Sequence, residues 1–316
     1  MATDSLPANS VPRGKASAAT HRRRSGLGRI EVRDGWLMAA PFLIGVVAFW
    51  AGPMFYSLYL ITQQWNLITP PMPIGLGNLQ QLFADPRVGI ALWNTAYYTF
   101  LGVPLRLAAA FALALALNQR LRGLPLLRAV FYVPAIVPAV ASSVIWLQLL
   151  NPEYGLVNAI LQWFGLPAVA WLYQPMAAKP AFILMSLWGI GPQMIIFLAA
   201  LQNTPRELLE AAEIDGAGSW ARFTHVTIPI VSPVILFNLT MGIIGSFQVF
   251  TSALVMTRGG PQNATLFMVL YIYDTAFSLF RMGYSAALAW LLFLIIMAVT
   301  FVQWRITNRW VYYETA

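Results

Sequence analysis

The residue types that most enzymes use for catalysis are scarce in this chain. It contains no cysteine, which excludes disulfides, thiolate metal sites and cysteine nucleophiles. Its two histidines, His21 and His225, lie far apart, and neither has a partner at the spacing of metal ligands. A P-loop needs Gly-Lys followed by Ser or Thr, but the only lysines, Lys15 and Lys179, precede alanine and proline. We therefore expect no enzymatic activity and no cofactor, metal or ATP bound by this chain itself.

Polar and small residues recur at steps of three or four within one apolar stretch, residues 227–257. They are Asn238, Gly242, Gly245, Gln248 and Ser252. On a helix this spacing gathers them on one stripe. Amides offer both donors and acceptors to hydroxyl groups, so the stripe either lines a hydrated path for a solute or packs against another helix, because small residues let helices approach closely.

Four further residues are candidates for contact with a solute. Gln193 offers an amide, and Phe247 offers a ring on which an apolar face of a solute can pack. Trp188 either does the same or anchors its helix at the membrane surface. Arg106 is the one charge in the interior of an expected membrane-spanning helix, away from its ends, and such a charge is a functional candidate by default. It either binds an anionic solute, bonds backbone carbonyls near Pro104, or faces a polar surface of a partner.

Long apolar segments must position these residues. Hydrophobic residues make up 59% of the 316 residues and charged residues only 9%, against about 25% charged in soluble domains. A helix needs about 20 apolar residues to cross a bilayer. The sequence therefore predicts an all-α integral membrane protein. Its six expected transmembrane helices lie near 36–61, 91–117, 127–150, 177–201, 227–257 and 283–306.

The basic residues indicate how these helices are oriented. The net charge is +8, but the arginines gather in the N-terminal tail and in short loops, which is typical of membrane orientation and not of nucleic-acid binding. We expect residues 1–34 to be a disordered basic tail and residues 35–316 to be the transmembrane domain, with both termini cytoplasmic. The apolar stretch from Trp36 to Ile61 exceeds the core of a signal peptide, although a cleaved signal peptide is the alternative.

The cytoplasmic loop expected between the fourth and fifth helices, residues 204–224, has clear helix signals. Thr204 and Glu207 have the spacing of a capping box, Pro205 suits the first helical position, and Gly216 suits the residue that ends a helix. So short a helix is marginal alone in water. It either docks in a groove of a partner or lies on membrane lipid.

This loop also carries a family signature. Glu210-Ala211-Ala212, then Gly216 and Val226-x-Ile228-Pro229, resembles the cytoplasmic EAA signature of binding-protein-dependent ABC transporter permeases. Other segments are similar to the sugar-permease branch, of the maltose and glycerol-phosphate uptake type. They are Gly75-Leu-Gly-Asn78, Asn94-Thr95, Asn151-Pro-Glu-Tyr-Gly155 with Asn158, Arg258-Gly-Gly-Pro261 and Met282-Gly-Tyr284.

The resemblance implies a division of labour. In the family the EAA helix docks into a cleft of the cytoplasmic ATPase. The residues expected to couple transport to ATP hydrolysis are therefore Glu210, Ala211, Ala212, Asp215 and Gly216. The implied partners are a second permease subunit that is a different chain, two ABC ATPase subunits that bind ATP and Mg²⁺, and an extracytoplasmic solute-binding protein. The implied location is a bacterial-type inner membrane.

The expected solute is a neutral carbohydrate such as an oligosaccharide, and the alternative is glycerol phosphate or a polyol. An ion-coupled secondary carrier is the alternative of another class. Proton-driven carriers usually hold acidic residues within the membrane, whereas none of the eleven acids falls inside an expected crossing.

Overall fold

The computed structural model describes residues 24–119 and 123–307. The chain divides into an N-terminal unit, residues 1–56, and a main unit, residues 57–316. The N-terminal unit contains α1 (Arg24–Val46), the π-helical turn η1 (Val47–Ala51) and the start of α2 (Gly52–Leu60). Large apolar side chains such as Trp36, Phe42 and Trp50 are exposed along it, as expected of a helix surrounded by lipid.

The start of α1 corrects the predicted boundary of the N-terminal tail. The helix already begins at Arg24, so the expectation of disorder is wrong for residues 24–34, while residues 1–23 lie outside the described residues. Extending a helix adds one hydrogen bond per residue fixed and costs far less than starting one. The apolar helix can therefore continue into polar residues such as Glu31 and Arg33.

Three long helices are central to the main unit. They are α4 (Pro86–Leu117), α12 (Ile228–Phe247) and α15 (Met282–Thr307). Helix α4 starts five residues earlier than predicted, because Asp85 caps it by accepting from the Arg87 amide and Pro86 occupies the first position. Helix α12 packs between α4 and α15, and the buried core includes Val103, Phe247 and Leu288.

Two predicted crossings are bent pairs of helices. The third consists of α5 (Leu124–Tyr132), the 3₁₀ turn η2 (Val133–Ile136) and α6 (Ala139–Leu149), bent by 101°. The fourth consists of α8 (Pro175–Trp188) and α9 (Gly191–Gln202), bent by 50°. Pro134 and Pro138 explain the first bend, because proline removes a helical hydrogen bond. Each of these two pairs falls within one range expected from the sequence, residues 127–150 and 177–201, and the structure divides each range at its bend.

The described residues nevertheless confirm an all-helical membrane protein. Four helices in them are long and apolar enough to span a bilayer, and six spans result if each bent pair is one span. The four are residues 31–60, 86–117, 219–256 and 282–307.

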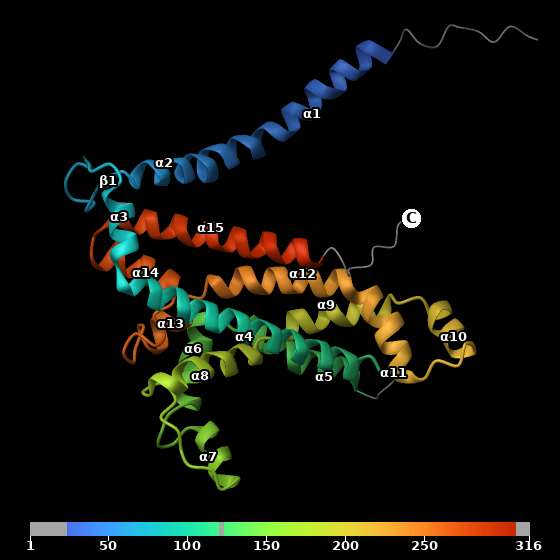
Figure 1. Cartoon of the computed structure of the whole chain (residues 1–316). Helices are drawn as coiled ribbons and strands as arrows, with labels where there is room; N and C mark the ends of the chain where they lie inside the picture. The colour runs from blue at the N-terminus through green and yellow to red at the C-terminus, as the bar shows by residue number, and fades with distance from the viewer. Residues whose placement is uncertain (1–23, 120–122, 308–316) are drawn as a thin grey trace, which may run out of the picture. The chain divides into compact units, whose positions relative to one another are not determined.

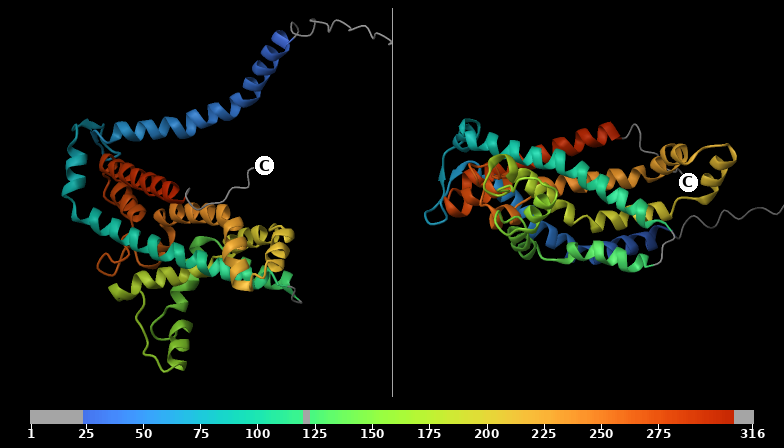
Figure 2. Two further views of the ribbon diagram at one scale, coloured as in Figure 1. Left: turned by 45° about the vertical axis from the view of Figure 1, so that its right-hand side comes forward. Right: turned by 90° about the horizontal axis from the view of Figure 1, so that it is seen from below.

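Short elements lie between these helices. Before the long helix α12 come α10 (Arg206–Ile214), α11 (Ser219–Arg222) and the π-helical turn η3 (Phe223–Thr227). Elsewhere are α3 (Gly77–Ala84), α7 (Leu156–Trp163), α13 (Thr251–Met256), α14 (Met268–Tyr273), η4 (Asp274–Ser278) and the strands β1 (Gln63–Gln64) and β2 (Met72–Pro73). The strands pair antiparallel, with Gln63 opposite Pro73. Within the main unit, α10 and α11 lie at one end of α4 and α12, and α3 and α14 lie at the other (Figures 1 and 2).

Candidate translocation path and coupling loop

A cavity of about 390 Å³ lies where both bent pairs break. Its walls come from α4, η2, α6, α8 and α13. Four rings line it, from Tyr98, Phe182, Trp188 and Phe250, together with the hydroxyls of Ser142, Ser186, Thr251 and Ser252. Rings provide apolar area and hydroxyls provide hydrogen bonds in either direction. This central cavity can therefore accommodate a neutral solute that has both apolar faces and hydroxyl groups.

Arg106 also lines the central cavity. It is half-buried, and its Nη2 donates a hydrogen bond to the Ser246 hydroxyl. The cation is thus held by a neutral group while it borders the space available to a solute. From this position Arg106 can either stabilise the packing of α4 against Ser246 or bind a solute in the cavity. A structural role and a solute-binding role were both among those expected from the sequence.

The predicted polar stripe divides between two environments. Ser252 and the separately predicted Trp188 line the cavity. Asn238 is buried and donates to the Val234 carbonyl at 3.0 Å, and a Cβ at Gly242 would lie 3.0 Å from the Val103 side chain. These two residues follow the packing alternative. Helix α12 ends at Phe247, so its helical spacing does not extend to Ser252, which lies on α13.

The other predicted path residues also lie off the cavity wall. Phe247 is buried, and its ring meets the edge of Phe100 at 6.3 Å. The Gln193 Oε1 atom is buried and has no hydrogen-bond partner among the described residues. Gln248 is exposed, and a Cβ at Gly245 would meet nothing within 4 Å.

Sequence reasoning missed Tyr98, Ser142 and Phe182 as cavity residues. They lie on three different helices, and a period within one helix cannot show which faces of separate helices converge. The one signal in the sequence that indicated this cavity was the pair Pro134 and Pro138, because these prolines mark the bend between α5 and α6 that borders it.

The coupling loop, residues 204–224, forms the short helix that the sequence predicted. Its end is a Schellman motif: the Gly216 amide donates to the Glu213 carbonyl at 3.0 Å and the Ala217 amide to the Ala212 carbonyl at 2.9 Å. Gly216 has a φ of +82°, a conformation that glycine adopts without cost. The predicted capping box is wrong, because the Thr204 hydroxyl donates back to the Ala200 carbonyl at the end of α9.

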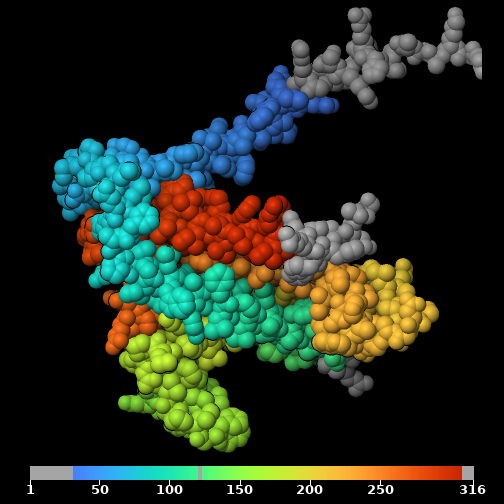
Figure 3. All heavy atoms as spheres, in the orientation of Figure 1, coloured from blue at the N-terminus to red at the C-terminus, as the bar shows by residue number. Residues whose placement is uncertain are grey.

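The EAA residues are accessible to a partner. Glu210, Ala211, Asp215 and Gly216 are exposed and Ala212 is partly exposed. Two large apolar side chains beside them are also exposed, Ile214 at 86% and Trp220 at 75%. In the space-filling view this part of the chain forms the end of the main unit opposite α3 (Figure 3).

A line of contacts joins the coupling loop to the long helices. Arg222 of α11 forms an ion pair with Glu213 of α10 at 2.6 Å. The Phe223 ring stacks on Phe111 of α4 at 6.1 Å, and Phe111 meets the edge of Phe197 of α9 at 5.2 Å. The coupling loop therefore contacts α4 through Phe223, and Phe111 of α4 in turn contacts α9.

Comparison with known proteins gives consistent matches over most of the chain. The probable ABC transporter permease protein YesP of Bacillus subtilis is 38% identical, covering 89% of this chain and 92% of YesP. The lactose transport system permease protein LacF of Rhizobium radiobacter is 35% identical, covering 89% and 96%. The trehalose/maltose transport system permease protein MalF of Thermococcus litoralis is 32% identical, covering 87% and 94%.

A solved structure shows the same fold. A chain of a bacterial alginate ABC transporter, in complex with an alginate pentasaccharide-bound periplasmic protein, superposes with a TM-score of 0.77 at 23% identity, covering 89% of this chain and 96% of that one. The sequence profile of the family described as "Binding-protein-dependent transport system inner membrane component" matches residues 82–311. On this match and the identity to YesP, the chain belongs to the family of binding-protein-dependent inner-membrane permeases of ABC transporters.

Proposed function

We propose that this permease carries a carbohydrate, an oligosaccharide or a similar neutral sugar, through the central cavity. The observation that carries the proposal is the combination of four rings with four hydroxyls at the point where both bent pairs break. Sugars present apolar faces and hydroxyls, which this lining matches. The relatives named for lactose and for trehalose and maltose transport support the same class of solute.

The α10 helix is proposed to connect the permease to its energy source. As an ABC permease component, the chain lacks an ATPase domain, and separate ATPase subunits bind ATP. Its multi-pass location is the inner membrane. The positive-inside rule supports a cytoplasmic position for both termini and the coupling loop, where Ile214 and Trp220 are available for docking on an ATPase subunit. A second permease subunit and an extracytoplasmic solute-binding protein complete the proposed complex.

The mechanism follows from the contacts of α4. Closure of the ATPase subunits on ATP would push α10, and the pair Phe223 and Phe111 would transmit the displacement to α4. The same helix contributes Tyr98 and Arg106 to the cavity wall. Nucleotide binding must favour one arrangement of the helices over the other by its differential affinity. Because the chain belongs to the ABC permease family, the alternative of a self-sufficient ion-coupled carrier has no support.

An anionic solute such as glycerol phosphate is the second candidate, and Arg106 at the cavity wall favours it. Hydrogen bonds to charged groups are worth about 1.5–3 kcal/mol. Replacing Arg106 with Gln should therefore reduce uptake of an anionic solute more than about tenfold, whereas uptake of a neutral sugar should change little.

Uptake into proteoliposomes tests both candidates. The reconstituted complex should contain both permease subunits, the ATPase subunits and the cognate binding protein, with lactose, maltose, trehalose and glycerol 3-phosphate as labelled solutes. ATP-dependent uptake of at least one of the neutral sugars is expected, and Trp188→Ala should weaken it. Uptake of glycerol phosphate alone, lost in Arg106→Gln, would overturn the neutral-sugar proposal.

A further inference from the structure

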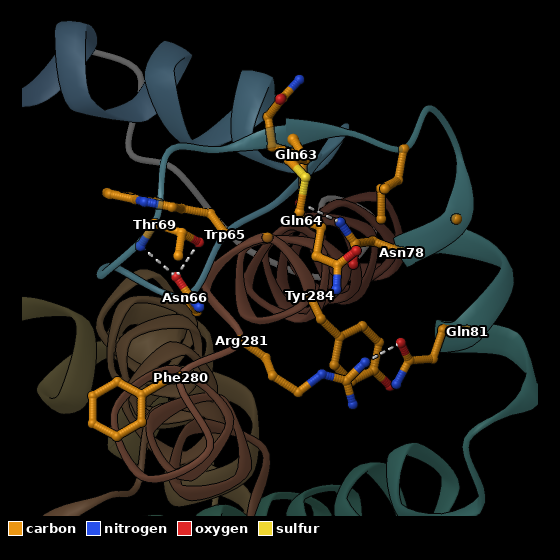
Figure 4. Close-up of a pocket in the computed structure, with 14 residues that line it drawn as sticks. Gln63, Gln64, Trp65, Asn66, Thr69, Asn78, Gln81, Phe280, Arg281 and Tyr284 are labelled. Carbon is orange, nitrogen blue, oxygen red and sulfur yellow. Dashed lines mark hydrogen bonds between the residues drawn. The ribbon is translucent and has the colours of Figure 1, made fainter.

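We propose that the end of the main unit opposite α10 carries a second saccharide-binding site, separate from the central cavity. This outer pocket has a volume of about 420 Å³ and lies between the β1–β2 hairpin, α3 and the start of α15 (Figure 4). Such a volume is typical of small-molecule sites, which range over about 300–1,000 Å³. The class of ligand and the extracytoplasmic position both rest on the proposed function.

The walls of the outer pocket are fixed by close backbone contacts. The Asn78 amide donates to the carbonyls of Ile61 at 2.8 Å and Gln63 at 2.9 Å, and the Met282 amide donates to the Trp65 carbonyl at 2.9 Å. A Cβ at Gly283 would lie 1.8 Å from the Gln63 carbonyl oxygen, so only glycine fits. Two sequence motifs far apart in the chain, Gly75-Leu-Gly-Asn78 and Met282-Gly-Tyr284, thus meet to build one preformed site.

Amide groups with unused hydrogen-bonding capacity line this site. Among the described residues, the Gln64 side chain has no hydrogen-bond partner. Asn66 Oδ1 accepts from the Thr69 hydroxyl at 2.8 Å, and Gln81 Oε1 accepts from Arg281, but neither side-chain NH₂ group has a partner within the described parts of the chain. These three amides can donate hydrogen bonds to the hydroxyls of a polyol. The Gln64 side chain can also accept hydrogen bonds from them.

Aromatic and planar groups supply the apolar surface. Trp65, Phe280 and Tyr284 line the pocket. Arg281 reaches across it to Gln81 (Figure 4), with its guanidinium carbon 5.0 Å from the centre of the Tyr284 ring. The Tyr284 hydroxyl in turn donates to Asp85 at 2.8 Å. Held in this way before a ligand arrives, the groups lose little entropy on binding.

The balance of charge favours a neutral ligand. Arg281 is the one ionised side chain in the described lining of the outer pocket, and its guanidinium is already used by Gln81 and the Tyr284 ring. The remaining polar side-chain groups are neutral amides, the hydroxyls of Thr69 and Tyr284 and the Trp65 indole N–H, which match hydroxyl groups better than a carboxylate or phosphate. The apolar face of a hexose ring can pack on the aromatic side of the pocket, while the hydroxyls of the sugar form hydrogen bonds with Gln64, Asn66 and Gln81.

A single introduced cysteine provides the test, because the chain contains none of its own. Met72 lines the outer pocket with 58% of its surface exposed, so Met72→Cys should react with a membrane-impermeant maleimide in the assembled complex without its binding protein. Lactose, maltose and trehalose are added as probes, with glycerol 3-phosphate as the anionic comparison. Tyr154→Cys, exposed in the loop between α6 and α7, is the matched control.

We expect at least one neutral disaccharide to slow labelling at position 72 at least threefold without affecting position 154. Adding Gln64→Ala and Gln81→Ala should abolish the protection. Absence of protection, protection that survives both substitutions, protection by glycerol phosphate alone, or protection by the binding protein but not by free sugar would each overturn the inference. Sugar uptake by the unmodified complex is measured separately: uptake without protection defeats only this site, and absent uptake defeats the proposed function.

Discussion

Replacing Gly216 with Ala perturbs the end of α10 and little else. The residue has a φ of +82°, and a Cβ added there would meet nothing within 4 Å. The cost is therefore confined to the backbone, about 1–2 kcal/mol for an L-residue in the left-handed conformation. That free energy changes the equilibrium between the formed and unformed helix end by a factor of about 5–30. Docking that requires the formed end should weaken accordingly.

The assay compares ATP-driven solute uptake in proteoliposomes with thermal unfolding of the purified complex. Gly216→Ala should lose most of its uptake while the unfolding temperature of the transmembrane part is retained. Gly165→Ala is the matched control, because Gly165 has a φ of +75° and equally open surroundings but lies after α7. Full uptake by Gly216→Ala, or an equal loss in Gly165→Ala, would refute the reasoning.

Three further predictions concern the helix bend, the line of rings and the Asp85 network. A Cβ at Gly191 would lie 2.6 Å from the Phe131 carbonyl oxygen, whereas one at Gly189 would meet nothing within 4 Å. Gly191→Ala should therefore destabilise the permease by about 1–3 kcal/mol and Gly189→Ala should not, as measured by thermal unfolding; equal stability of the two variants would contradict this. Phe111→Leu removes two ring contacts worth about 0.5–1.5 kcal/mol each, so uptake should fall while basal ATP hydrolysis persists, and unchanged coupling would argue against transmission through Phe111. Burial raises the pKa of Asp85, but hydrogen bonds from two tyrosine hydroxyls and a backbone amide outweigh it, and the net pKa lies below the usual range. The ionised form thus contributes stability above the ordinary aspartate pKa that is lost as pH falls through the lowered one, so unfolding temperature should depend less on acidic pH in Asp85→Asn than in the unmodified protein.

The sequence was most informative where one local pattern determines the structure. The apolar runs predicted the membrane helices, and the motif around Glu210-Ala211-Ala212 and Gly216 predicted a short helix with a glycine at its end, as the Schellman motif confirms. Helical spacing also predicted a stripe along α12, but it does not state which neighbour that stripe meets. Asn238 therefore lies in a packed interface, although its residue type suits a path.

The two pockets depend on contacts that no local pattern records. The central cavity joins Tyr98 of α4 to Phe250 before α13, and its shape follows from the bends after α5 and α8. The outer pocket joins Gln64 to Arg281 across most of the chain. Both motifs that form its walls were visible in the sequence, but only the fold shows that Gly283 lies against the Gln63 backbone.

Contact between α10 and an ATPase subunit is the most direct test of the account. A photo-crosslinking phenylalanine derivative at Ile214, which is 86% exposed, should crosslink the permease to the ATPase subunit in the intact complex. The same group in place of Trp163, which is 83% exposed on α7, should not. Crosslinking from position 214 to lipid alone, or to the solute-binding protein, would contradict the coupling role of α10.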